Sequence, residues 1–341
     1  MTSNRSVPTL YDVAKTAGVS TATVSRCLNS PEQVVEHTRK RVLEVVHQLG
    51  YTPNFGARAM AAKRTYTIGA VIPTMENAIF ARGLQAFQEE LRASGYTLLV
   101  SSSAYDPKIE EEQIRALIAR GADGLLLIGH DRTATVAEYL EKQGTPAVAA
   151  WSYEADGTLP SVGFDNRSAM RALAQEVLAL GHRRIGVISG ITDGNDRARR
   201  RVEGILDAVS DAGLGRDCVE ISETPYDIAN GAAAFRLFMQ AEEKPTVVMC
   251  GNDVLAAGAL RAAAEMDIRV PQDVSVTGFD DIELAGILSP PLTTVHVPHR
   301  EMGRTAARTL IGMVQNGTSG KTSLLEARLC LRGSLAAPGS D

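Results

Sequence analysis

Beyond residue 65, short apolar runs rich in β-branched residues alternate with longer amphipathic stretches. The runs are TIGAVIP (67–73), YTLLVSSS (96–103), DGLLLIG (123–129), PAVAAW (146–151), RIGVISG (184–190), TVVMCG (246–251), VSVTGF (274–279) and TTVHV (293–297). Strands spaced by helices predict parallel sheets built from βαβ units. A weak internal echo, IGAVI in the first half and IGVI in the second, indicates two similar lobes. Two such lobes form a ligand cleft where their strand ends face each other.

The first 50 residues follow a helical spacing instead. The pattern predicts helices over 10–17, 21–28 and 36–49, with Thr9 and Ser20 as N-caps and glycines after the first and third. A short helix, a Gly-containing turn and a second short helix form a helix-turn-helix unit. This part is therefore expected to be a small all-α domain that binds DNA.

The exposed face of the second predicted helix suits a DNA major groove. It carries Thr21, Ala22, Ser25 and Arg26. Small side chains let a helix approach the base edges, and Arg26 can reach a guanine or a phosphate. The alternative for Arg26 is a solvated surface charge.

Charge is divided unevenly along the chain. The 341 residues hold 35 Lys and Arg against 40 Asp and Glu, a formal net charge of −5. Residues 1–64 hold nine basic and four acidic side chains, a surplus of five positive charges, and the rest carries a surplus of ten negative ones. A basic head on an acidic body indicates that the head binds a polyanion.

Several classes of protein do not fit the sequence. No apolar run reaches the roughly 18 residues of a membrane helix, and the first residues lack the apolar core of a signal peptide, so a cytoplasmic protein is expected. The four cysteines have no metal or redox spacing. No dinucleotide motif, P-loop, nucleophile elbow or HExxH motif occurs, and the six histidines are scattered. We expect no enzyme, no cofactor and no metal. A sugar-binding transport protein, which would need a signal peptide, also fits poorly.

Two motifs carry a family resemblance. TLYDVAKTAGVSTATVSRCLN (9–29), followed by LGYTPNFGARAM (49–60), resembles the lactose/galactose-repressor (LacI/GalR) family of bacterial transcriptional regulators, and the resemblance extends to about residue 335. It implies base reading by Thr21, Ala22 and Arg26, and a hinge helix from Asn54 to about Ala61 that folds only on operator DNA. The full set of DNA-binding positions that it implies is Thr9, Leu10, Ser20, Thr21, Ala22, Thr23, Ser25, Arg26, Asn29, Tyr51, Asn54, Ala57, Arg58 and Met60.

Two positions depart from the family pattern. Met60 stands where the family has a leucine that wedges into the minor groove, and methionine is a more flexible apolar wedge. Val35 stands where the family usually has a serine that caps the third helix, which would lower local stability by about 1 kcal/mol.

The resemblance also implies a domain plan and a multidomain fold, with an all-α head and a two-lobed α/β core like that of periplasmic binding proteins. We expect a helix-turn-helix domain over 1–51, a hinge over 52–64 and a core over 65–341. Lobe 1 would span about 65–164 and 297–325, and lobe 2 about 165–296 and 326–341. The implied effector-binding residues are Phe80, Trp151, Phe164, Asp165, Arg201, Tyr226, Asn252 and Asp280. Plain core packing for Phe80 and helix capping for Asp280 are the alternatives, and Arg199 and Arg200 are expected to be solvated.

The function expected from these residues is sequence-specific repression of carbohydrate-utilisation genes. A homodimer would bind a roughly palindromic operator, and a sugar, sugar acid or sugar phosphate between the lobes would change its affinity. Whether the effector acts as inducer or corepressor stays open. We expect a cytoplasmic protein, associated with the nucleoid when bound to its operator. No leucine heptads follow the core, so no tetramer-forming coiled coil is expected.

Overall fold

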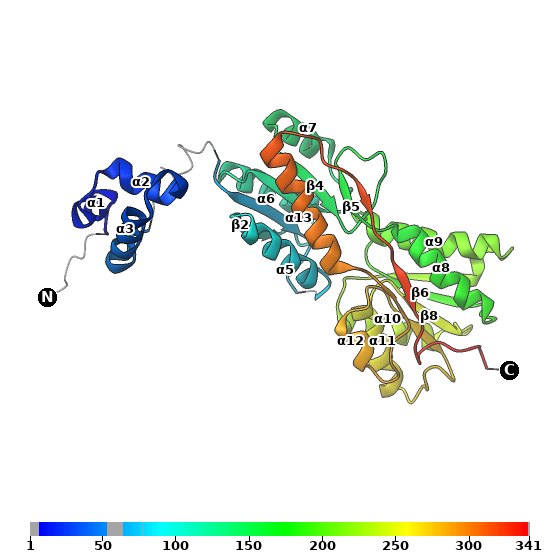
Figure 1. Ribbon diagram of the computed structural model, residues 1–341. Helices are drawn as coiled ribbons and strands as arrows, with labels where there is room; N and C mark the ends of the chain where they lie inside the picture. Colours follow the sequence, from blue (N-terminus) through cyan, green and yellow to red (C-terminus); the bar gives the residue numbers. More distant parts are fainter. Residues whose placement is uncertain (1–6, 53–63, 77, 340–341) are drawn as a thin grey trace. The chain divides into compact units, whose positions relative to one another are not determined.

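The chain divides into two compact units, Met1–Tyr66 and Thr67–Asp341 (Figure 1). The computed structural model describes residues 7–52, 64–76 and 78–339. The proposed hinge positions Asn54, Ala57, Arg58 and Met60 lie outside the described residues.

The first unit is a three-helix head whose core is a small cluster around Val13, Val24 and Val42. Its elements are α1 (Leu10–Ala17), α2 (Thr21–Asn29), the 3-10 turn η1 (Pro31–Gln33) and α3 (Glu36–Leu49). A reciprocal capping box starts α1, because the Thr9 N–H donates to Asp12 at 2.8 Å and the Asp12 N–H donates to the Thr9 hydroxyl at 3.3 Å. These helices confirm the predicted head.

The turn between α1 and α2 depends on Gly18, which ends α1 in the left-handed region with φ of 64°. The Ser20 hydroxyl then accepts from the Thr23 N–H at 3.1 Å and caps α2. By contrast, α3 begins after Val35 without a side-chain cap.

Lobe 1 is built on a six-stranded parallel sheet with the order β11-β5-β4-β3-β1-β2. The strands are β1 (Thr67–Ile72), β2 (Thr97–Ser102), β3 (Gly124–Ile128), β4 (Ala147–Ala150), β5 (Ser161–Gly163) and β11 (Ser323–Leu324). The helices are α5 (Ala78–Ala93), α6 (Pro107–Ala119), α7 (Ala134–Gln143) and α13 (His299–Asn316). Side chains of α6 and α7 pack with β3 in one apolar cluster, while α5 packs against α13. The fully buried strands β1 and β3 are typical of a parallel sheet covered by helices.

Lobe 2 repeats this plan on a four-stranded parallel sheet with the order β7-β6-β8-β9. The strands are β6 (Ile185–Ser189), β7 (Val219–Glu223), β8 (Val247–Cys250) and β9 (Ser275–Thr277). The helices are α8 (Asn166–Ala179), α9 (Asp196–Asp211), the 3-10 turn η2 (Arg216–Cys218), α10 (Ile228–Gln240), α11 (Asp253–Glu265) and α12 (Glu283–Ile287). One apolar cluster of this lobe joins α10 and α11 to β8. The two-lobed α/β core is therefore confirmed.

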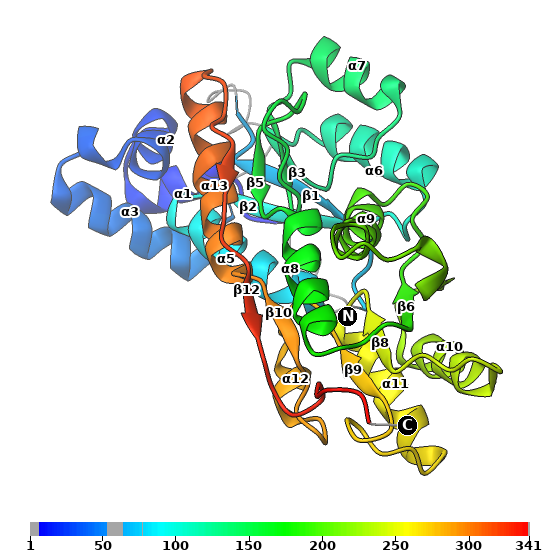
Figure 2. The same cartoon turned by 90° about the vertical axis from the view of Figure 1, so that its right-hand side faces the viewer.

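One predicted strand departs from the parallel pattern. β10 (Thr294–His296) pairs antiparallel with β12 (Arg328–Cys330), and the two run side by side between the lobes (Figure 2). The predicted parallel pairing of residues 293–297 is present only as isolated bridges, from Thr293 to Thr277 at the end of β9 and from His296 to Asp280, while the other edge of the segment meets the returning C-terminal chain.

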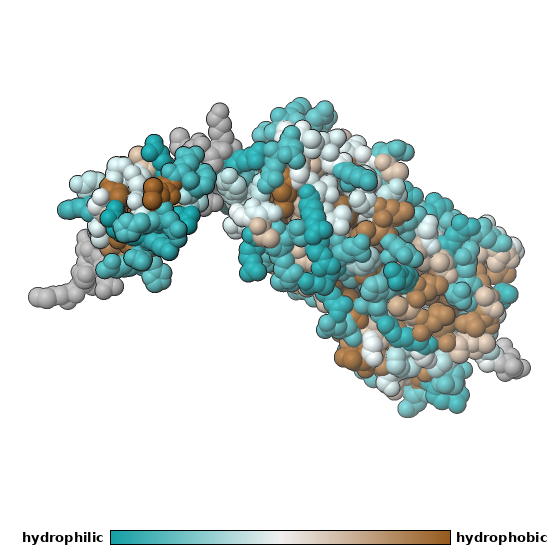
Figure 3. Space-filling view, viewed as in Figure 1, coloured by the Kyte–Doolittle hydropathy of each residue, from teal (hydrophilic) through white to brown (hydrophobic). Residues whose placement is uncertain are grey.

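The surface is mixed in character. On the face shown in Figure 3, hydrophilic residues cover much of lobe 1, and hydrophobic ones gather over lobe 2 near β6 and β8. Among the described residues, no helix is both long enough and apolar enough to span a bilayer.

Candidate functional site

The DNA-reading face predicted on α2 is open to solvent. Thr21, Ala22 and Arg26 are exposed, and Asn29 donates from its side-chain amide to the Ser25 hydroxyl at 3.2 Å. Thr9 and Ser20 act as helix caps. The remaining described positions of the set, Leu10, Thr23 and Tyr51, are half-buried. The predicted base-reading positions therefore form an exposed strip of small side chains ending in one guanidinium.

A small cavity of about 20 Å³ lies between the two lobes of the core. Its lining residues are Ile79, Phe80, Tyr105, Trp151, Asn195, Arg197, Arg201, Tyr226 and Asp280. We call it the aromatic cavity. Five of the eight sequence-predicted effector residues line it: Phe80, Trp151, Arg201, Tyr226 and Asp280. At about 10–15 Å³ for each ordered water, the cavity holds one or two waters in this closed arrangement.

Arg201 is fixed at the floor of the aromatic cavity by α9. Its Nε donates to the Asn166 side chain at 2.8 Å, and its Nη1 donates to the Gly251 carbonyl at 2.6 Å. Its Nη2 lies 3.4 Å from Asp280, and its guanidinium stacks over the Phe279 ring at 3.8 Å. These four contacts together orient the guanidinium.

Trp151 forms the aromatic wall together with Phe80. The two rings meet edge to face with their centroids 5.4 Å apart. Trp151 is 1% exposed, has φ of 61°, and its backbone N–H faces the Met302 sulfur at 3.2 Å. Within the described chain, the Trp151 indole N–H and the Asp280 Oδ2 are buried without a hydrogen-bond partner. A buried donor and acceptor on one cavity indicate that a polar ligand or water completes it.

Three sequence-predicted effector residues do not line the cavity. Phe164 is buried and stacks on Phe279 at 5.9 Å, so it supports the ring that carries Arg201. Asp165 is exposed and caps α8 by accepting from the Arg167 and Ser168 N–H groups. Asn252 is fully buried and caps α11, with its Oδ1 accepting from Leu255 at 2.9 Å.

Sequence reasoning missed four residues that line the aromatic cavity: Ile79, Tyr105, Asn195 and Arg197. Arg197 precedes Arg201 by one helical turn, so the spacing on one helix face could have revealed it. Tyr105 follows β2 with φ of 61°, and no motif marks it. Its ring lies 5.8 Å from that of Tyr226 across the cleft. Burial raises the pKa of both phenols, so they stay neutral hydrogen-bonding groups.

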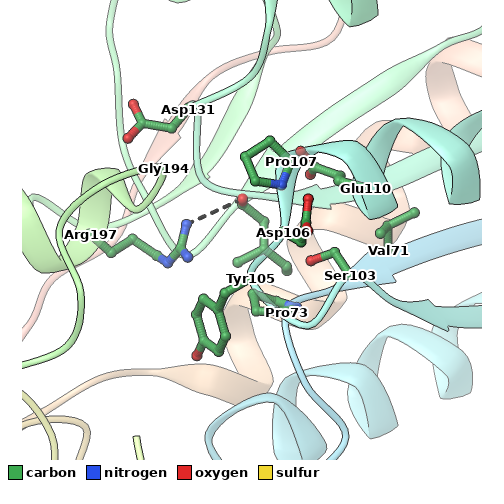
Figure 4. A pocket seen from close by; sticks show the side chains of 11 residues that line it. Val71, Pro73, Ser103, Tyr105, Asp106, Pro107, Glu110, Asp131, Gly194 and Arg197 are labelled. Atoms are coloured by element: carbon green, nitrogen blue, oxygen red, sulfur yellow. Dashed lines mark hydrogen bonds between the residues drawn. The ribbon is translucent and has the colours of Figure 1, made fainter. Parts of the chain in front are cut away.

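A second cavity of about 30 Å³ adjoins the first and shares Tyr105 and Arg197 with it (Figure 4). Its lining residues are Val71, Pro73, Ser103, Tyr105, Asp106, Pro107, Glu110, Ile128, Asp131, Gly194 and Arg197. We call it the carboxylate cavity. It lies at the carboxyl ends of β1, β2 and β3, where open α/β sheets bind ligands.

The first turn of α9 holds lobe 2 against the loop that follows β3 in lobe 1. Arg199 forms two hydrogen bonds of 2.7 Å with Asp131. Asp196 accepts from the His130 backbone N–H at 3.1 Å. Arg200 is exposed as expected, and the Arg199 side chain is 42% exposed but also pairs with Asp131 of lobe 1, a contact that the sequence did not predict.

Behind the cavity, a buried carboxyl group supports the loop that carries Asp280. Asp253 accepts from the Ile282 N–H at 2.8 Å and from the Thr294 hydroxyl at 2.6 Å. Burial, with a further contribution from the nearby Asp280 charge, raises the pKa of Asp253 to about 8. This carboxyl group therefore remains largely protonated at neutral pH.

A helix-turn-helix head joined to a two-lobed α/β core defines a class of protein, the DNA-binding transcriptional regulator. Residues 9–54 match the bacterial regulatory proteins of the lacI family, and residues 174–335 match the periplasmic binding protein-like domain. The chain belongs to the LacI family. It is a DNA-binding transcriptional repressor rather than an enzyme.

Relatives and solved structures agree over nearly the whole chain. Catabolite control protein A of Priestia megaterium is 32% identical over 302 residues, which cover 89% of this chain and 91% of the relative. The ribose operon repressor of Haemophilus influenzae is 32% identical over 331 residues, 96% of this chain and 98% of the relative. The crystal structure of the lac repressor dimer, bound to operator and the anti-inducer ONPF, superposes with a TM-score of 0.85 at 27% identity. That match covers 97% of this chain and all of the lac repressor chain.

Proposed function

We propose that this chain represses carbohydrate-utilisation genes as a homodimer on a roughly palindromic operator, and that a small effector between its lobes changes operator affinity. The effector would be a sugar, a sugar acid or a sugar phosphate. The repressor would act in the cytoplasm and would associate with the nucleoid while it is bound to its operator. The observation that carries the proposal is the aromatic cavity. It combines aromatic faces for sugar C–H groups with Asp280 and Arg201 for polar groups.

The head supplies the DNA-binding half of the proposal. The small side chains of Thr21 and Ala22 let the exposed face of α2 enter a major groove. Arg26, on the same face, can then reach a base or a phosphate. The crystal structure of the lac repressor, a dimer bound to operator, supports the same assembly for this chain. We assign DNA reading to residues 1–51, a DNA-dependent hinge to 52–64 and effector binding to 65–341.

The core supplies the regulatory half. Phe80, Tyr105 and Trp151 come from lobe 1, whereas Arg201 and Tyr226 come from lobe 2. A ligand that touches both lobes binds the closed and open arrangements with different free energies, and only such a ligand can shift their equilibrium. Coupling of this kind is worth about 1–3 kcal/mol, or 5- to 150-fold in operator affinity.

The DNA-binding claim is tested by selecting duplexes from a random pool with the purified full-length protein. We expect enrichment of an inverted repeat whose half-sites are bound by two copies of the chain. Arg26→Ala should lose the enrichment, and Arg171→Ala, in lobe 2, should keep it. Recovery of duplexes with no common sequence, or equal enrichment by Arg26→Ala, would contradict the proposal.

A further inference from the structure

The charges in the cleft distinguish between the three proposed effector classes, which are sugars, sugar acids and sugar phosphates. Every guanidinium in or beside the two cavities, among the described residues, already faces a carboxylate. The pairs are Arg201–Asp280 at 3.4 Å, Arg197–Asp196 at 2.8 Å, Arg199–Asp131 at 2.7 Å and Arg132–Glu110 at 3.1 Å. The cleft therefore offers an anion no unpaired positive charge.

The carboxylate cavity adds a negative charge beyond these pairs. Asp106 lines it and caps α6 by accepting from the Lys108 N–H at 2.7 Å, and no arginine or lysine pairs with it in the described chain. A phosphate or carboxylate placed here would lie near the unpaired charge of Asp106 and be repelled by it, because Glu110 and Asp131 are already paired with Arg132 and Arg199. Hydroxyl groups, by contrast, can donate to carboxylate oxygens.

The buried polar groups of the aromatic cavity that lack a hydrogen-bond partner also favour hydroxyl groups over an anion. Asp280 Oδ2 lacks a donor, and the Trp151 indole N–H lacks an acceptor. A hydroxyl group is both donor and acceptor, so adjacent hydroxyls on one ligand can satisfy the two groups. An anion could accept from Trp151 but would leave Asp280 unsatisfied and repel it.

Arg197 connects the two cavities. Among the described residues it donates hydrogen bonds through Nη1 alone, to the Ile128 carbonyl at 3.2 Å and to Asp196 at 2.8 Å. Figure 4 shows its guanidinium reaching into the space between Asp131 and Tyr105. Its other N–H groups are positioned to donate to a ligand that passes from one cavity to the other.

We propose that the effector is an uncharged polyhydroxylated molecule larger than one sugar ring. It would place one ring in the aromatic cavity and extend past Arg197 into the carboxylate cavity. This inference rests on the proposed function, in which the cleft binds the effector, and it selects the neutral class over sugar acids and sugar phosphates. Because the closed cavities hold only about 20 and 30 Å³, the ligand enters as the lobes part.

The test measures thermal stabilisation of the full-length protein by named compounds. The panel contains maltose, cellobiose, lactose and trehalose, with glucose and galactose as their component rings. Glucose 6-phosphate, trehalose 6-phosphate, gluconate and lactobionate are the anionic counterparts. We expect a neutral disaccharide to bind at least about tenfold more tightly than its component rings and its anionic counterpart. A best ligand that is anionic, or a single ring as good as the disaccharide, would overturn the inference.

Two matched variants test whether the carboxylate cavity causes the discrimination between neutral and anionic ligands. Asp106→Asn keeps a side chain that can cap α6 but removes the extra charge from the carboxylate cavity. It should reduce discrimination against the anionic counterpart several-fold. Asp227→Asn makes the same change at the exposed cap of α10, outside both cavities, and should leave discrimination unchanged. Equal behaviour of the two variants would contradict the role of the carboxylate cavity.

If no compound binds although the duplex selection succeeds, this inference fails and the DNA-binding half of the proposed function stands.

Discussion

Arg199 of lobe 2 and Asp131 of lobe 1 hold each other through two parallel hydrogen bonds, each 2.7 Å long. The same turn of α9 places Asp196 against the backbone of His130 and Arg197 against that of Ile128. Three successive polar contacts therefore join the lobes on one side of the cleft. These contacts hold the two lobes together.

Removing this ion pair should loosen the closed arrangement. We expect Arg199→Ala, Asp131→Ala and the double variant to give a coupling free energy of about 0.5–1 kcal/mol in urea unfolding, since both side chains are partly solvated. Emission from Trp151, the only tryptophan, should shift to longer wavelength in each variant as water enters the cleft.

The control for that cycle is the Arg171–Asp211 ion pair, which joins α8 and α9 inside lobe 2. Its removal should leave Trp151 emission unchanged. Equal emission shifts from both pairs would show that the Arg199–Asp131 contact has no special role in holding the lobes together.

Asp253 should make the stability of the core depend on pH. Its pKa rises from 3.8 in the unfolded chain to about 8, so the protonated form stabilises the fold at low pH. This contribution falls by up to about 1.4 kcal/mol per pH unit as pH rises from the unfolded pKa of 3.8, and it is lost once pH passes the folded pKa of about 8. Asp253→Asn mimics the protonated side chain and can still bond to Ile282 and Thr294.

Urea unfolding at pH 5.5, 6.5 and 7.5 checks this prediction. The stability of Asp253→Asn relative to the unmodified chain should rise with pH. Asp227→Asn, at the exposed cap of α10, should show no such trend. A pH-independent difference for Asp253→Asn would contradict a raised pKa at this position.

The uncapped start of α3 predicts a stabilising substitution. Val35 is the N-cap residue, is 76% exposed, and offers no acceptor to the first N–H groups of the helix. Val35→Ser should stabilise the head by about 1 kcal/mol, seen as roughly fivefold slower hydrogen exchange of α3 amides. Val35→Ala is the control, and equal exchange in the two variants would refute the capping account.

Two glycines on α13 should respond in opposite ways to the same change. A Cβ on Gly303 would lie 2.0 Å from the Gly83 carbonyl of α5, whereas a Cβ on Gly312 meets nothing within 4 Å. Gly303→Ala should therefore destabilise lobe 1 by about 1–3 kcal/mol through overpacking. Gly312→Ala should stabilise it by up to about 1 kcal/mol through helix propensity. Thermal unfolding of both variants measures these opposite changes in stability. Similar melting temperatures would contradict the close packing of α5 on α13.

The helices of the head and the strands within the eight apolar runs were predictable from the sequence, whereas β5, β7, β11 and β12 were not. The runs at 67–73 and 123–129 became β1 and β3 because their apolar residues are buried on both faces. β11 and β12 span two or three residues, too few to show a period of two. β7 (VEISE) is an edge strand with a half-exposed face. It therefore contains polar residues and lacks the continuous apolar run by which the other strands were predicted.

The cleft was predictable only in part because capping and ligand-binding residues occupy similar places, just after a strand. Asp165 and Asn252 both follow strands and precede helices, and both face the helix N–H groups rather than the cavity. Tyr105 reaches the cavity through a left-handed backbone conformation, and its partner Tyr226 lies 121 positions later. Contacts of this kind depend on how the lobes close, which no local pattern encodes.

The central claim is that a ligand in the cleft changes the affinity of the head for its operator. Fluorescence anisotropy of the selected duplex should be measured with and without the panel compound that stabilises the protein most. For the unmodified chain we predict a 5- to 150-fold change in operator Kd at saturating ligand. Arg201→Ala should bind the operator normally yet lose this response, and Arg26→Ala should not bind. An operator Kd that a saturating ligand leaves unchanged would contradict the account.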